Sequence, residues 1–364
     1  MSHDIAAISG GFDIPGIYAS AQAYGNGHIN DTYLAVYQAG DERTLYVHQR
    51  INHDVFRDPP AVMQNVERVL THIRGKLHGK PDAARRVLTL VPARDGRSYY
   101  RDASGNYWRT YKHISAGRSL DVMSDPKRAF EAAKAFGAFQ RLLDDLPGPR
   151  LNDTIPDFHH TPKRFAALEK AVKADSHGRV ARVGRELEFA RSRQAIAGVL
   201  QDLQARGEIP ERIVHNDTKG NNVIIDDSTG EGLCVIDLDT VMPGLALHDF
   251  GDMARATATR ADEDEQDLSK VEIDLTLFEP VARGYLAGMG DLLNPAEKAH
   301  LALSARIIAL ELGVRFLTDY LQGDAYFKPR REGHNLDRCR AQFKLVESME
   351  HAHEDMDAIV RRAG

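Results

Sequence analysis

The sequence predicts an α+β protein with two lobes, in which a small antiparallel β-sheet with one helix precedes a larger, mainly helical part. Three observations lead to this prediction. Runs of alternating apolar and polar residues, separated by turn residues, fill most of the first third of the chain. From about Ser119 the spacing of the apolar residues becomes helical. After residue 210, two short apolar runs lead into polar loops that contain Asp.

The first strands are indicated by a period of two. Residues 33–37 and 44–51 alternate, and residues 39–41 between them favour a turn, so we expect a hairpin. Residues 60–77 carry apolar side chains on one face, which predicts an amphipathic helix. Two further strands are expected, over residues 86–92 and 107–114.

Glycines precede the first of these strands, in the segment from Tyr24 to Tyr33. Gly25 and Gly27 lack a Cβ and would let the backbone approach phosphate groups closely. Glycines also mark ordinary turns, so a nucleotide site here depends on the motifs further along the chain.

The remaining two thirds are expected to be mainly helical. Asp125 followed by Pro126 is typical of a helix start, and Phe130, Phe136 and Phe139 follow with helical spacing. Further helices are expected over residues 162–174 and 186–205. We predict an N-terminal lobe over residues 1–115 and a C-terminal lobe over residues 116–364.

Composition limits the class of protein. With 364 residues, 42% hydrophobic and 27% charged, the chain is typical of a globular protein with a large core. Its net charge of -6 argues against a nucleic-acid partner. Cys234 and Cys339 form no Cys-x-x-Cys motif. Neither a signal peptide nor an apolar run of membrane length is visible, so we expect a cytoplasmic protein without a membrane partner and leave its oligomeric state open.

The stretch from His215 to Asn222 carries the most specific motif. Asp217 follows His215 by two residues, Lys219 follows Asp217 by two, and Asn222 follows Asp217 by five. In a kinase catalytic loop, an Asp orients the acceptor hydroxyl and takes its proton, and an Asn further along holds magnesium. This spacing predicts a phosphotransferase that uses ATP and Mg²⁺, with Asp217 as the base.

A second Asp-containing segment follows at a distance that suits another metal ligand. Val235 and Ile236 are apolar and lead into Asp237 and Asp239. A solvated turn is also rich in Asp, but it does not explain carboxylates at the end of an apolar strand, where an unpaired charge is costly. We expect Asp237 to bind magnesium together with Asn222. Asp239 is assigned as a further metal ligand, and a bracing role in the loop is the alternative.

Together these segments resemble the aminoglycoside phosphotransferase and choline kinase superfamily, which shares the protein-kinase-like fold. Within it, the chain is most similar to the N-acetylhexosamine 1-kinases, which are anomeric sugar kinases. The likeness spans almost the whole chain, and general kinases lack its C-terminal segment. The matching stretches are Tyr24–Asn30, Asn216–Lys219, Ile236–Gly244, Asp249–Asp252, Arg315–Leu321, Tyr326–Phe327, His334–Leu336 and Gln342–Val346.

The resemblance implies roles for individual residues. The catalytic base would be Asp217, and the magnesium ligands would be Asn222 and Asp237. The residues implied around ATP are Gly25, Gly27, Gln49 and Lys219. The positions that match sugar contacts in such kinases are Arg315, Tyr326 and His28. Without the resemblance, Arg315 would be read as a salt-bridged residue and Tyr326 as a packing residue.

The chain also departs from the general kinase pattern. Gln49 stands where the usual lysine of the third strand would be, and similar sugar kinases also carry Gln there. Glu67 on the following helix could pair with Arg50 instead, or could be exposed. Ala256 stands where a related kinase has an aromatic residue near the sugar, which would widen the pocket.

These observations predict ATP- and Mg²⁺-dependent phosphorylation of the C1 hydroxyl of an N-acetylhexosamine, either GlcNAc or GalNAc. The alternative in the same superfamily is a kinase of another sugar, an amino alcohol or an aminoglycoside, although Arg315 in the pocket argues against a cationic substrate. The missing lysine suggests an inactive nucleotide-binding module, against which the retained Asp217, Asn222 and Asp237 weigh. The run that begins at Asp249 imitates a protein-kinase motif but lies after the metal-binding strand, so we expect Asp249 to brace the catalytic loop.

Overall fold

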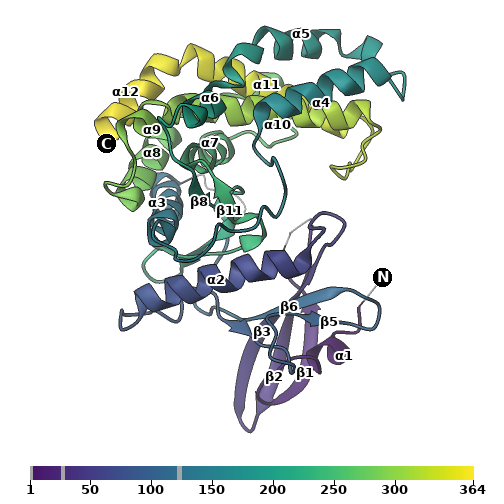
Figure 1. The fold of residues 1–364 in the computed structure, drawn as a ribbon, viewed down its shortest axis with the longest axis vertical. Coiled ribbons are helices and arrows are strands. Elements are labelled where there is room, and N and C mark those ends of the chain that lie inside the picture. Colours follow the sequence, from purple (N-terminus) through teal and green to yellow (C-terminus); the bar gives the residue numbers. More distant parts are fainter. Residues whose placement is uncertain (1–2, 26–28, 121–124) are drawn as a thin grey trace.

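The computed structural model describes residues 3–25, 29–120 and 125–364. Figure 1 shows a β-sheet at one end of the molecule and a larger group of helices at the other, with helix α2 (Pro59–Leu77) lying between them. This is the two-lobed α+β arrangement that the sequence predicts. We propose the hinge at residues 115/116, where Arg85 Nη2 holds the carbonyl oxygens of Ser115 and Ala116 at 3.1 and 2.7 Å.

The large sheet is antiparallel. Its strands are β1 (Ile17–Ala23), β2 (Asp31–Ala39), β3 (Glu42–Ile51), β4 (Leu90–Val91), β5 (Tyr100–Arg101) and β6 (Tyr107–Lys112). Their order is β1-β2-β3-β6-β4, with β5 also paired to β6. The predicted hairpin is confirmed, since β2 and β3 pair in continuous register from Asp31↔Arg50 to Ala39↔Glu42.

Two details of this sheet differ from the prediction. Only Leu90 and Val91 of the predicted strand over residues 86–92 pair with β6. Val87 and Leu88 are buried in the core instead, so their apolar character reflects packing rather than strand pairing. The edge strand β1 was not expected, because most of its side chains are exposed and show no apolar alternation.

Helices cover both faces of the sheet. Successive residues of a strand point to opposite faces, so the side chains of Trp108 and Arg109 on β6 lie on opposite faces of the sheet. Trp108 packs in an apolar cluster with residues of the short helix α1 (Ile5–Ser9). Arg109 lies on the other face, where it contacts Met63 of α2. The predicted helix over residues 60–77 is confirmed, and its apolar stripe is buried.

The remaining helices form the larger part of the molecule. They are α3 (Pro126–Leu143), α4 (Thr161–Ala174), α5 (Gly184–Ser192), α6 (Val199–Ala205), α7 (Ala246–Thr257), α8 (Leu275–Met289), α9 (Pro295–Ala299), α10 (Leu301–Leu321), α11 (His334–His351) and α12 (His353–Ala363). The predicted single helix over residues 186–205 is wrong. The chain breaks there into α5, a 3₁₀ turn over Gln194–Ile196 and α6, which begins after the poor helix former Gly198.

Small residues allow α3 and α8 to pack closely. A Cβ on Gly137 of α3 would overlap the carbonyl oxygen of Tyr285 on α8, so only glycine fits there. Tyr285 in turn donates a hydrogen bond to the carbonyl of Ala246 at 2.8 Å, which ties α8 to the start of α7. The helix that carries the site is therefore fixed by the core.

Two small sheets present the polar loops. Strand β8 (Arg212–Val214) pairs with β11 (Met242–Gly244), and β9 (Val223–Asp226) lies between β7 (Gly117–Arg118) and β10 (Gly232–Val235). The loop from His215 joins β8 to β9, and the segment with Asp237 and Asp239 joins β10 to β11. Because β8 pairs with β11 and β9 pairs with β10, both loops run between the same two small sheets, which brings them side by side.

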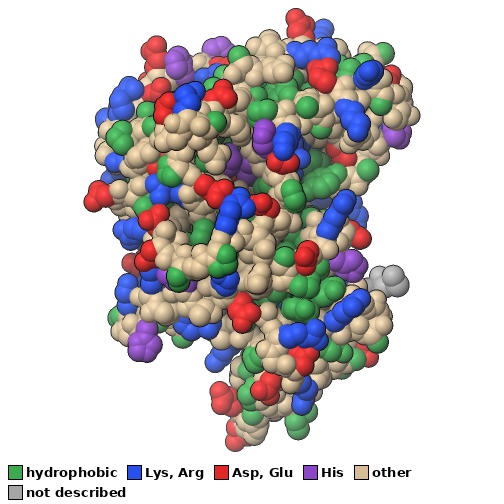
Figure 2. Space-filling view, in the orientation of Figure 1, with side chains coloured by type: hydrophobic (Ala, Val, Ile, Leu, Met, Phe, Trp, Pro, Cys, Tyr) green, Lys and Arg blue, Asp and Glu red, His purple; other side chains and the backbone are tan. Residues whose placement is uncertain are grey.

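On the face in Figure 2, acidic and basic side chains are interspersed. No helix in the described part of the chain is long and apolar enough to cross a membrane.

Candidate active site

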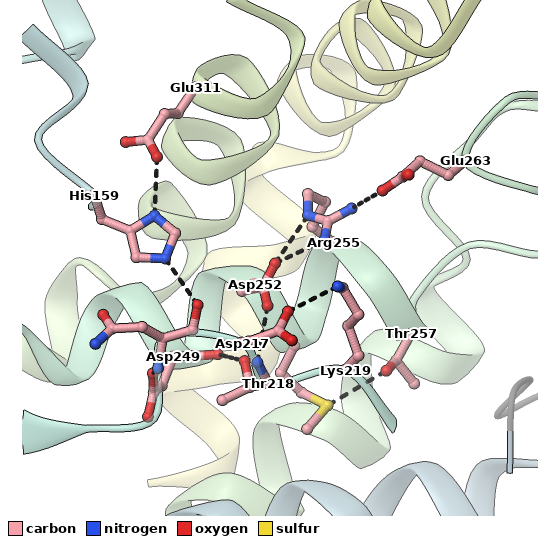
Figure 3. Close-up of polar contacts among 12 residues, drawn as sticks. His159, Asp217, Thr218, Lys219, Asp249, Asp252, Arg255, Thr257, Glu263 and Glu311 are labelled. Carbon is pink, nitrogen blue, oxygen red and sulfur yellow. Dashed lines mark hydrogen bonds and ion pairs between the residues drawn. The ribbon is translucent and has the colours of Figure 1, made fainter. Parts of the chain in front are cut away.

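The catalytic loop is held by two carboxylates of α7 (Figure 3). The oxygens of Asp249 accept backbone hydrogen bonds from His215 at 2.8 Å and from Asn216 at 2.7 Å. Asp252, about one turn later, accepts from the backbone of Thr218 at 2.9 Å. Asn216 has a left-handed backbone with φ of 65°, which persists only where the surroundings hold it. The predicted bracing role of Asp249 is confirmed.

Asp217 lies at the centre of these contacts. Its Oδ1 is 2.8 Å from Lys219 Nζ, and its Oδ2 accepts a hydrogen bond from Asn222 Nδ2 at 3.1 Å. Burial alone would raise the pKa of this carboxyl, but Lys219 and Asn222 lower it below its usual value. Asp217 is therefore ionised at neutral pH. Its side chain is 27% exposed, which leaves room for an acceptor hydroxyl.

Asp237 lies beside this loop, since Ile236 N donates to the carbonyl of Asn222 at 2.9 Å. Its backbone is left-handed, with φ of 60°. Within the described residues, no donor or cation pairs with its carboxylate. Burial, together with the negative charges of Asp239 and Asp217, raises the pKa of Asp237 to about 6. A carboxylate in such surroundings is suited to a cation.

These donors fit a magnesium ion. Mg²⁺ prefers oxygen ligands and is usually held by one or two carboxylates together with substrate phosphates. Asp237 offers a carboxylate. Asn222 uses its amide nitrogen toward Asp217, so its amide oxygen is left for a ligand. No group of three His, Cys, Asp or Glu that could hold a metal is found in the described ranges.

Asp239 is engaged differently. Its Oδ1 pairs with Arg109 of β6, and its Oδ2 accepts from Asn30 Nδ2 at 2.6 Å. Gln49 Oε1 accepts from the same guanidinium, at 2.9 Å from Nε and 2.5 Å from Nη2. Coulomb attraction to Asp239 outweighs the effect of burial and raises the pKa of Arg109. The sequence analysis missed Arg109, which only the β3–β6 pairing brings to Gln49.

The alternative pair between Arg50 and Glu67 is not formed. Arg50 Nε lies 2.6 Å from Oδ2 of Asp31, its cross-strand neighbour on β2. Glu67 is exposed on α2. The reason is the strand period: Arg50 points to the face opposite Gln49, whereas α2 covers the Gln49 face.

A buried His–Glu pair supports the catalytic loop from the other side (Figure 3). His159 lies with Nδ1 2.9 Å from Glu311 Oε1 and with Nε2 3.1 Å from the carbonyl oxygen of Asn216. Burial lowers the pKa of His159, but Glu311 outweighs this and raises it. Burial alone would raise the pKa of the Glu311 carboxyl, but His159 outweighs this and holds the pKa at about 2. His159 lies in a loop and Glu311 on α10, so no local motif indicates the pair.

Arg315 and Tyr326 are brought together. The Arg315 guanidinium lies 6.0 Å from the ring of Tyr326, 5.5 Å from Phe327 and 5.1 Å from Phe158. Within the described chain, no carboxylate pairs with Arg315. The ring of Tyr326 lies 4.8 Å from that of Phe327, and the residue is 54% exposed. Phe158 directly precedes His159, so this cluster lies next to the pair that supports the loop. Among the described residues, no direct contact joins the cluster to Asp217.

The glycine segment is only partly described. Gly25 has φ of 78°, and a Cβ there would meet no atom within 4 Å, so glycine is required by the backbone rather than by crowding. Gly27 and His28, for which roles at the nucleotide and the sugar are predicted, lie outside the described residues.

A small cleft opens next to Lys219, with a volume of about 110 Å³. Ala256 lines it together with Arg255, Glu263 and Gln342. Ala256 thus lines a cleft beside Lys219. Arg315 and Tyr326 do not line this cleft, so the predicted sugar contacts lie in a separate cluster.

The residues gathered here have the chemistry of group transfer. Asp217 can accept a proton, Lys219 places a positive charge beside it, and Asp237 with Asn222 offers oxygen ligands for a cation. Positioning and charge neutralisation of this kind carry most of the catalysis in phosphoryl transfer.

Comparison with known proteins identifies the family of this chain. Residues 20–288 match the model of the phosphotransferase enzyme family, APH. Among solved structures, an aminoglycoside phosphotransferase from Alicyclobacillus acidocaldarius superposes with a TM-score of 0.61 at 12% identity, over 100% of this chain and 96% of that one. Choline kinase from Cryptosporidium parvum gives 0.58 at 13% identity over 96% of each chain. Spectinomycin phosphotransferase in complex with ADP and spectinomycin gives 0.55 at 11% identity, over 93% of this chain and 94% of that one. The similar structures share the fold, and the family match shows that this chain belongs to the phosphotransferase enzyme family.

Proposed function

We propose that the protein is an ATP- and Mg²⁺-dependent kinase of a small-molecule hydroxyl, and that its acceptor is the C1 hydroxyl of an N-acetylhexosamine. The observation that carries the kinase assignment is the grouping of an ionised Asp217, held by Lys219 and Asn222, beside the unpaired carboxylate of Asp237. A family whose structural neighbours include complexes with ADP and AMP supports a nucleotide as phosphoryl donor.

In this mechanism, Asp217 orients the acceptor hydroxyl and takes its proton as the oxygen attacks the γ-phosphorus, and the bond between the γ-phosphorus and the bridging oxygen breaks to release ADP. The anomeric hydroxyl is more acidic than an ordinary alcohol, so one carboxylate suffices as base. Lys219 stabilises the negative charge of the transferred group. Asp237 and Asn222 would hold magnesium, which would neutralise negative charge on the phosphates. Asp249 and His159 keep the loop in the conformation that presents Asp217.

The sugar assignment is supported by the unpaired Arg315 beside the exposed Tyr326. A planar guanidinium suits sugar oxygens, and an exposed aromatic ring suits the apolar face of a pyranose. A cationic acceptor would instead need carboxylates or an aromatic cage without an arginine. Choline, ethanolamine and aminoglycoside kinases among the neighbours keep these acceptors as the second candidate.

A coupled assay of ADP release tests the proposal across N-acetylglucosamine, N-acetylgalactosamine, other hexoses, choline, ethanolamine and an aminoglycoside. The proposal expects turnover with an N-acetylhexosamine that requires Mg²⁺. Turnover only with an amino alcohol or an aminoglycoside would replace the sugar assignment by the second candidate. If no compound in the panel raises ADP release above the rate measured without an acceptor, both assignments are contradicted.

A further inference from the structure

Gln49 stands in the position of the usual strand lysine, and its side-chain amide binds Arg109. Gln49 of β3 pairs across the sheet with Thr32 on one side and with Arg109 on the other. Its Nε2 donates to Thr32 Oγ1 at 3.0 Å, which turns its carbonyl oxygen toward Arg109. That oxygen accepts from both Nε and Nη2 of the guanidinium, at 2.9 and 2.5 Å. These hydrogen bonds therefore fix the orientation of the Arg109 guanidinium relative to the sheet.

The third nitrogen of Arg109 pairs with Asp239. The two side chains are 1% and 2% exposed, so this is a fully buried ion pair. The second oxygen of Asp239 accepts from Asn30 Nδ2 at 2.6 Å, and Asn30 Oδ1 accepts from the backbone of Asn52 at 2.9 Å. Both oxygens of Asp239 thus bind groups of the sheet, whereas Asp237, two residues earlier, binds none among the described residues.

A metal ligand at Asp239 would have to share its charge with Arg109. Removing one partner of a buried ion pair leaves the other charge uncompensated, which is strongly unfavourable. Asp237 carries no such cost, because its carboxylate has no counter-charge to give up. The two carboxylates, although close in sequence, are therefore prepared for different tasks.

We propose that Arg109 supplies the fixed positive charge of this site in place of the strand lysine, and that Asp239 is a positioning residue that anchors the metal loop to the sheet through Arg109 instead of binding magnesium. Asp237 is then the carboxylate left for the metal. The inference rests on the proposed use of magnesium and nucleotide. It assigns Arg109 no contact with the substrate.

The test compares Asp237→Asn with the matched Asp239→Asn in two measurements. The first is urea unfolding with EDTA and without nucleotide. The second is a Mg²⁺ titration at saturating ADP, followed by the melting temperature. In urea, Asp239→Asn should lower the midpoint clearly and Asp237→Asn should not. In the titration, Asp237→Asn should raise the half-saturating Mg²⁺ concentration by about tenfold or more, and Asp239→Asn by less than about twofold.

Arg109→Met gives a signature that a merely structural residue would not produce. It frees Asp239 next to Asp237, so the half-saturating Mg²⁺ concentration should fall by about fivefold, because a second carboxylate becomes available. Adding Asp239→Asn to Arg109→Met should cancel this gain. If Asp239→Asn does not fold, Asn30→Ala removes the second contact of Asp239 together with the hydrogen bond from Asn52 N, leaves the Arg109 pair in place, and should leave the half-saturating Mg²⁺ concentration unchanged.

An Asp239→Asn variant that unfolds like wild type in EDTA but needs as much Mg²⁺ as Asp237→Asn would overturn the inference. Weaker Mg²⁺ binding by Arg109→Met, or a raised midpoint in Asn30→Ala, would overturn it as well. A wild-type protein that ADP and Mg²⁺ do not stabilise would contradict the proposed function instead, and the urea measurement would still decide whether Asp239 anchors the loop.

Discussion

The buried pair between His159 and Glu311 allows a prediction whose size follows from the structure. Glu311→Gln keeps the shape of the side chain and removes its charge. Burial alone would raise the pKa of the Glu311 carboxyl, but His159 outweighs this and holds it at about 2, so the carboxylate is charged in the folded protein. Breaking a buried ion pair of this kind costs roughly 3–5 kcal/mol. We expect the free energy of unfolding at pH 7 to fall by about 3 kcal/mol.

The pH dependence has a definite sign. A carboxyl whose pKa is lower in the folded state stabilises the protein above its unfolded pKa, and this contribution is lost as the pH falls toward the folded pKa. For Glu311 the loss should occur between pH 4.5 and about 2, and it should be absent from Glu311→Gln. Because His159 also holds the carbonyl of Asn216, turnover at pH 7 should fall more than the KM for ATP changes.

Thr161→Val is the matched control, because it removes only the hydrogen bond from Thr161 Oγ1 to Glu311 Oε2 at 2.7 Å. It should cost about 1 kcal/mol and leave turnover close to wild type. Urea unfolding from pH 7 to pH 3, with kinetics at pH 7, measures both effects. The reasoning is refuted if Glu311→Gln is no less stable than Thr161→Val and turns over equally fast.

Four further predictions address other parts of the account. Asp217→Asn should lower turnover by about 10²–10⁴-fold with nucleotide affinity nearly intact, and a variant with more than about half of wild-type activity would remove Asp217 as the base. Asp237→Ala should abolish Mg²⁺-dependent ATP binding, as calorimetry at varied Mg²⁺ can measure; an unchanged Mg²⁺ requirement would make Asp237 structural. Arg315→Lys and Tyr326→Phe should raise the KM for the sugar or lower turnover while the KM for ATP stays within a few-fold, since lysine lacks the fork and phenylalanine loses a hydrogen bond worth about 0.5–1.5 kcal/mol; an effect on ATP alone would place both residues elsewhere. Burial lowers the pKa of His48 from 6.5 to about 4. Between these pH values the unfolded state takes up a proton that the folded state does not, so the wild type should lose about 3 kcal/mol of stability as the pH falls. In urea titrations His48→Gln should flatten this dependence on pH, and an unchanged dependence would contradict the neutral state of His48.

What could be predicted from the sequence is what local patterns encode. The spacing from His215 to Asn222 and the apolar run before Asp237 predict two loops, and the structure places them side by side. Period-two and helical patterns likewise predicted the β2–β3 hairpin and α2. Arg109 and Glu311 were not predicted from local patterns, because their partners are distant in the chain and only the tertiary fold brings them together. The choice between a paired and an exposed Glu67 stayed open for a related reason, since the face to which Arg50 points depends on strand pairing that the sequence does not display.

The central claim is tested most directly by the product. Wild-type protein incubated with ATP, Mg²⁺ and N-acetylglucosamine or N-acetylgalactosamine is analysed by ³¹P NMR and by a reducing-sugar assay, with Asp217→Asn as the control. The account predicts an acid-labile, non-reducing sugar 1-phosphate whose formation depends on Asp217. A phosphorylated product that still behaves as a reducing sugar, or one that Asp217→Asn forms at the wild-type rate, would contradict it.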